Sequence, residues 1–93
     1  MEKTSAFKAL SDKTRREILN LLKEEGRMSA GDIASKFDMT QATVSHHLSN
    51  LTSASLETIE KQGKFIYYEI NTTVVQDILG WVMHLLGGDS NEK

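Results

Sequence analysis

Two short helical segments lie only two residues apart in the middle of this 93-residue chain. The first begins at Ser29, whose side chain is suited to cap a helix, and Thr40 is the expected N-cap of the second, which runs to about Ser53. The two residues between the segments are Asp38-Met39, a tight break in which Asp38 can adopt a left-handed conformation. This arrangement predicts a helix-turn-helix unit.

Two more helices are predicted before this unit. The first covers about residues 4–10. The second begins after the expected N-cap Asp12, runs to about Glu24 and stops at Gly26, because glycine readily ends a helix. Four helices are therefore expected in the first half of the chain.

The sequence changes character after Leu56, where β-branched and aromatic residues become frequent. They predict two strands joined by a two-residue turn at Gln62-Gly63. A last helix, capped by Thr72 or Thr73, is expected through about Leu86. The fold class is therefore mainly α with a β-hairpin wing, which is a winged helix-turn-helix.

The chain is long enough for a single compact domain. Residues 1–88 are expected to form it, combining DNA binding with dimerisation. Residues 89–93 are expected to be a disordered tail, because they are small or polar.

The fourth predicted helix divides into an apolar stripe of Val44, Leu48 and Leu51 and a polar side. Glutamine can pair with adenine, and serine, threonine and histidine can hydrogen-bond several bases. A polar side that meets only solvent is the better reading of this helix alone; the tight turn before it and the hairpin after it favour DNA. The predicted DNA-binding residues of this helix are Gln41, Ala42, Thr43, Ser45, His46 and Ser49.

No charged residue stands between Thr40 and Ser55, and the net charge of the chain is -2. Attraction to phosphate must then come mainly from other elements. Lys61 and Lys64 flank the turn of the wing and are expected to contact DNA. Lys36 fits equally well as a phosphate contact or as a solvated surface charge.

The last predicted helix carries more apolar residues than one-sided packing requires. This surplus predicts a homodimer, although the helix could instead be the core helix of a monomer. The predicted interface residues are Phe7, Leu10, Val75, Ile78, Trp81, Val82 and Leu85.

Four stretches of the chain together resemble the ArsR/SmtB family of bacterial repressors. They are Ser11-Asp12-Lys13-Thr14-Arg15-Arg16, Ala30-Gly31-Asp32-Ile33-Ala34, Thr43-Val44-Ser45-His46-His47-Leu48 and Lys61-Gln62-Gly63-Lys64-Phe65-Ile66-Tyr67-Tyr68. The segment from Asn71 to Trp81 resembles the subgroup of the sporulation-delaying-protein operon autorepressor.

The resemblance implies a homodimer that uses its first and last helices as the interface. The cytoplasm is expected because the sequence shows no cysteine, no secretory signal and no stretch long enough to span a bilayer. It also implies that the fourth helix enters the major groove of a palindromic operator and represses transcription, often of the protein's own operon. Gln41, Thr43, Ser45 and His46 match the family's base-reading positions, and Lys64 matches its wing. The chain departs from the family at Lys13, where proline is frequent, and at Ser55, where glycine is usual.

Metal sensing is not expected, although it occurs in many family members. The chain has no cysteine, so thiolate sites are excluded. Asp77 and His84 lie seven residues apart on the last helix and could form only a weak site between subunits. His46 and His47 are adjacent on a helix and point about 100° apart, so they do not readily share an ion.

No cofactor is expected, and the chain shows no nucleophile with a base and an orienting group, so an enzyme is not predicted either. Double-stranded DNA and a second copy of the chain are the expected partners. The alternative function is a protein-interaction module that docks a partner such as a membrane-bound antirepressor.

Overall fold

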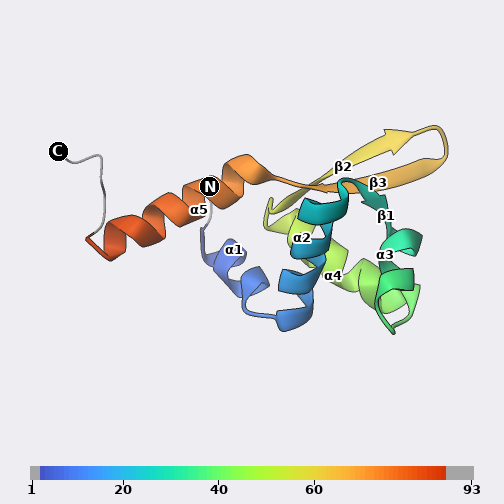
Figure 1. The fold of residues 1–93 in the computed structure, drawn as a ribbon, viewed down its shortest axis with the longest axis horizontal. Helices are drawn as coiled ribbons and strands as arrows, with labels where there is room; N and C mark the ends of the chain where they lie inside the picture. Colours follow the sequence, from blue (N-terminus) through green and yellow to red (C-terminus); the bar gives the residue numbers. More distant parts are fainter. Residues whose placement is uncertain (1–2, 88–93) are drawn as a thin grey trace.

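The part of the chain that the structure describes, residues 3–87 of a computed structural model, forms five helices and a three-stranded antiparallel sheet. Figure 1 shows the hairpin projecting at one end of the molecule and the last helix extending at the other. The predicted tail, residues 89–93, lies outside the described residues. The elements are α1 (Lys3–Leu10), α2 (Lys13–Glu25), β1 (Met28–Ser29), α3 (Ala30–Lys36), α4 (Gln41–Ser53), β2 (Glu57–Gln62), β3 (Phe65–Ile70) and α5 (Thr72–Leu85).

The apolar stripes of α2 and α4 form the centre of the core. Ile18 and Leu22 of α2 and Leu48 of α4 are at most 1% exposed. Further core residues come from the other elements: Ala6, Met28, Ile33, Leu56 and Ile78. This packing turns the opposite side of α4 toward solvent.

Three predicted N-caps are confirmed. The side chain of Asp12 accepts a hydrogen bond from the backbone N–H of Arg15. Ser29 caps α3 and Thr40 caps α4 in the same way, each bonding the N–H three residues on. The Thr40 cap fixes the end of the break that meets α4, and at its other end the N–H of Phe37 donates to the carbonyl of Ala34.

Three local predictions were wrong. The hairpin turn is Gly63-Lys64, because Gln62 pairs with Phe65 across the strands, and Gly63 has φ 63° as the first turn residue. Asn71, not Thr72 or Thr73, caps α5, and its side chain accepts from the N–H of Val74. Asp38 is not left-handed, because its φ is not positive; within residues 3–87, Ser55 is the one non-glycine residue with a positive φ.

The strand β1 was not predicted. It has only two residues, which is too short to show a period, and it joins the sheet through Met28 and Ser29 opposite Tyr68 and Tyr67. Strand order is β1-β3-β2, so β3 is central. The strand ties the start of α3 to the base of the wing.

Ser55 ends α4 in a Schellman motif. Its backbone N–H donates to the carbonyl of Thr52, and the N–H of Leu56 donates to the carbonyl of Leu51. Ser55 itself has φ 63°, a left-handed conformation that favours glycine. The side chain is exposed, so it gains little packing in return.

Replacing Ser55 with glycine is expected to raise the free energy of unfolding by about 0.5–1 kcal/mol. Glycine removes a Cβ penalty of about 1–2 kcal/mol, of which its greater freedom in the unfolded chain offsets about 0.5–1 kcal/mol. Urea denaturation at one protein concentration measures the change. Ser55→Ala is the matched control, because it keeps Cβ; equal stability of the two variants would contradict the prediction.

Candidate nucleic-acid interface

Helix α4 presents a polar surface because its apolar stripe anchors it to the core. Val44, Leu48 and Leu51 are completely buried. All six residues predicted to contact DNA from this helix are exposed: Gln41, Ala42, Thr43, Ser45, His46 and Ser49. Their donors and acceptors are available to a ligand along most of the helix.

Local hydrogen bonds orient part of this surface. Thr43 Oγ1 accepts from Thr40 Oγ1 at 3.0 Å, so its hydroxyl also serves the cap. Asn50 Nδ2 donates to the carbonyl of His46 at 3.0 Å and lies 3.4 Å from His46 Nε2. His47 is half-buried, with Nδ1 3.6 Å from Asp12 Oδ2. His46 therefore faces solvent, whereas His47 faces α2.

The wing meets α4 along two hollows. A groove of about 440 Å³ brings Gln41 and Ser45 together with Lys64 and Phe65. A recess of about 230 Å³ is lined by Ser45 and Ser49 together with residues of the sheet. Gln41 and Ser45 thus share a hollow with the predicted wing residue Lys64, and Ser49 borders the neighbouring recess. Ala42, Thr43 and His46 are exposed but line neither hollow.

The cations near the wing differ in whether a neighbouring carboxylate pairs with them. Arg27 donates to Glu60 and lies 5.2 Å from the ring centre of Tyr67, which ties its charge to the hairpin. This hydrogen bond holds the pKa of Glu60 below its ordinary value. Lys61 and Lys64 are exposed. They are the wing's cations closest to its turn.

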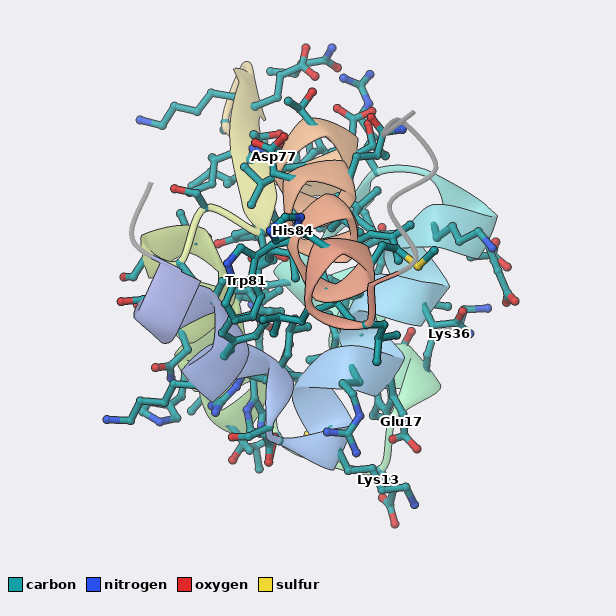
Figure 2. All side chains as sticks on the ribbon, turned by 90° about the vertical axis from the view of Figure 1, so that its left-hand side faces the viewer. Lys13, Glu17, Lys36, Asp77, Trp81 and His84 are labelled. Atoms are coloured by element: carbon teal, nitrogen blue, oxygen red, sulfur yellow. The ribbon has the colours of Figure 1, made fainter. Side chains whose placement is uncertain are left out.

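Lys36 is not brought together with the other predicted residues. It lies at the end of α3 in a separate groove of about 640 Å³, with Lys13, Glu17 and Phe37. Figure 2 shows Lys13, Glu17 and Lys36 on one side of the molecule. This position favours the interpretation of Lys36 as a surface charge.

The apolar residues of the wing were not predicted to be surface features. Phe65 is 54% exposed, Ile59 48% and Ile66 41%. Their residue types were used only as evidence for strands. The hairpin extends beyond the core, so its residues can be exposed on both faces.

A buried carboxyl group lies where α4 joins the wing. Glu57 is only 2% exposed; its Oε1 accepts from Thr52 Oγ1 at 3.1 Å, whereas its buried Oε2 has no partner within the described residues. Burial raises the pKa of Glu57 to about 8, against the smaller opposing effect of the Thr52 hydrogen bond. Burial and the Glu57 charge also raise the pKa of Tyr68. Glu57 is therefore mostly neutral at pH 7.

The predicted interface residues fall into three groups. Phe7, Leu10, Val75 and Val82 are half-buried, and Ile78 packs in the core of its own chain at 7% exposure. Trp81 is 40% exposed, with its ring centre 5.3 Å from that of Phe7, and Figure 2 shows it on the side of α5 toward α1. Leu85 is 62% exposed.

Further apolar side chains of α5 are exposed although the sequence analysis did not assign them to the interface. They are Leu79, Met83 and Leu86. Among residues 3–87, no helix has the length and apolar character needed to cross a bilayer. Within residues 3–87, Leu79, Met83 and Leu86 are thus left largely uncovered.

Asp77 and His84 lie along the same side of α5 in Figure 2. Among the described residues no three metal-binding side chains gather closely enough to hold an ion. The structure therefore adds no further ligand to this pair.

Comparison with known proteins gives consistent similarities. Residues 10–60 match a family model described as a helix-turn-helix domain. The transcriptional repressor SdpR of Bacillus subtilis is 46% identical, over 95% of this chain and 97% of that protein. An arsenical resistance operon repressor of Staphylococcus aureus is 37% identical, over 84% of this chain and 74% of that protein.

Two solved structures share the fold. An ArsR-like transcriptional regulator from Rhodococcus has a TM-score of 0.80 and 27% identity, covering 95% of this chain and 81% of that one. The homodimeric winged helix-turn-helix DNA-binding domain of a possible ArsR-family regulator from Mycobacterium bovis has a TM-score of 0.73 and 26% identity, covering 97% and 81%.

Proposed function

Because the chain belongs to the ArsR family of winged helix-turn-helix transcriptional repressors, we propose that it acts as a homodimer on a palindromic operator of its own operon. The observation that carries this proposal is the exposed, uncharged, hydrogen-bonding side of α4, which shares a groove with Lys64 of the wing. A surface of this kind suits the edges of bases in the major groove.

The position of each residue on α4 or the wing suggests its role in DNA binding. Gln41 and Ser45 lie at the start of α4 and read base edges, as do Thr43, His46 and Ser49, while Ala42 makes apolar contact. Lys61 and Lys64 contact phosphates from the wing, which fixes the register of α4 without reading sequence. Lys36 is a weaker candidate because it lies in another groove.

The dimer uses α1 and α5. A second copy would cover Trp81, Leu85 and the half-buried residues beside them, and the structural neighbour from Mycobacterium bovis is homodimeric. A two-fold dimer presents two symmetry-related copies of α4, one for each half-site of a palindromic operator.

Replacing Gln41 or His46 with alanine is expected to weaken binding to the DNA upstream of the protein's own gene. Each lost base-edge contact costs about 1–3 kcal/mol, or about 5- to 140-fold in affinity. Shift assays with this DNA and with an unrelated duplex measure the effect. The loss should be confined to the specific duplex.

Gln76→Ala is the control, because Gln76 is exposed on α5 and remote from the proposed reading surface. If the wild-type protein shows no preference for the upstream DNA even at low salt, the operator proposal fails. That result would favour the docking of a protein partner instead.

A further inference from the structure

The uncharged helix α4 has a second flank, on the side away from the recess that it forms with the sheet. There, α1 and the start of α2 pack against the C-terminal half of α4. They enclose a recess of about 200 Å³ whose polar lining residues are Ser5, Lys8, Arg15, Asn50 and Ser53. This recess thus combines two cations with hydroxyl and amide groups.

No carboxylate of the described residues lines the recess. Within residues 3–87, Lys8 and Arg15 form no ion pair with an acidic side chain. The nearby acidic groups have other partners: Glu17 pairs with Lys13. The carboxylate of Asp12 accepts from the backbone N–H of Arg15 and lies 3.6 Å from His47 Nδ1. Arg15 Nε donates to the carbonyl of Ala9 at 2.9 Å, which holds the guanidinium in place. The recess therefore suits an anion.

The position of the recess identifies the anion. A helix about 10–12 Å wide fills a major groove about 12 Å wide, so a phosphate backbone runs along each of its sides. On α4, Ser45 and Ser49 border the hollow toward the wing, whereas Asn50 borders the recess at α1, and Ser53 borders both. Lys64 thus stands on one flank, and Lys8 and Arg15 stand on the other.

We propose that Lys8 and Arg15 bind a backbone phosphate of the DNA strand opposite the one contacted by the wing. This inference rests on the proposed placement of α4 in the major groove. It supplies positive charge to a reading helix that has none, from residues outside the helix-turn-helix and the wing.

The test measures affinity against salt concentration for the full chain, on the upstream duplex and on an unrelated duplex of equal length. Lys8→Gln should make the slope of log affinity against log salt shallower by about 0.9 for each bound protomer, on both duplexes, because phosphate contacts are independent of sequence. Arg15→Lys should keep the slope, because the charge remains. Lys23→Gln removes an equal charge from the α2–α5 side and should also leave the slope unchanged.

Equal slopes for Lys8→Gln and Lys23→Gln on both duplexes would overturn the inference. A wild-type protein that binds both duplexes equally would instead overturn the proposed operator function. The difference in slope between the wild type and Lys8→Gln on either duplex would still test the role of Lys8. Lys8 is exposed, and its side chain makes no hydrogen bond within residues 3–87, where only its backbone carbonyl accepts from Ser11, so the variant should fold normally.

Discussion

Leu85→Glu is expected to convert the dimer to a monomer and to abolish specific binding to the operator. Leu85 is 62% exposed in its own chain, so a charge there leaves the monomer's core intact. In the proposed dimer, each of the two copies loses about 1.5–3 kcal/mol of apolar burial. The sum corresponds to a dimer dissociation constant raised about 140-fold to 2 × 10⁴-fold.

Sedimentation at micromolar concentration, circular dichroism and DNA binding test this together. Helix content should remain, while mass and operator affinity should fall. Gln76→Glu adds the same charge at an exposed polar residue of α5 that is not among the predicted interface residues, and should change neither. A Leu85→Glu protein that remains dimeric would show that α5 contributes its exposed leucines to something other than self-association.

The protein is expected to become less stable as the pH rises from about 5 to about 8, through Glu57. The folded chain holds the pKa of Glu57 at about 8, against an ordinary value of 4.5, so between these values the folded state binds one more proton than the unfolded state. The free energy of unfolding then falls by up to about 1.4 kcal/mol for each pH unit, which amounts to a few kcal/mol. Above about pH 8 this contribution stays constant.

Glu57→Gln isolates the effect. The amide oxygen can still accept from Thr52 Oγ1, and the glutamine side chain has no proton to lose in this pH range. We expect the variant to be more stable than the wild type at pH 8, with the difference shrinking toward pH 5. Urea denaturation of both proteins across this range measures it, and parallel pH profiles would contradict the assignment.

Local signals in the sequence predicted most of the architecture. Asp12, Ser29 and Thr40 are caps whose partners lie three residues away, so their role can be read without a structure. Ser55 was also identified from the sequence, because it stands where the family usually has glycine, and this difference indicated a strained end of α4. The solvent-facing residues of α4 followed from the spacing of Val44, Leu48 and Leu51.

Long-range placement could not be predicted in this way. Strand β1 exists only because Met28 meets Tyr68, forty residues later. The recess at Lys8 and Arg15 depends on α1 packing against α4, and the burial of Glu57 depends on where the wing leaves the core. The sequence left Lys36 equally suited to a phosphate contact and to a solvated surface charge, and only its position in another groove separates it from the wing lysines.

Helix α5 has one further consequence. Ile78 is its one buried residue among those described, so its exposed apolar side chains would gain a cover from the second copy in the proposed dimer. While monomers predominate, the amount of dimer rises with the square of the chain concentration, and halving the chain lowers the dimer about fourfold. Dilution during growth, or a partner that occupies α5 of the monomer, would then release the operator without any small-molecule inducer.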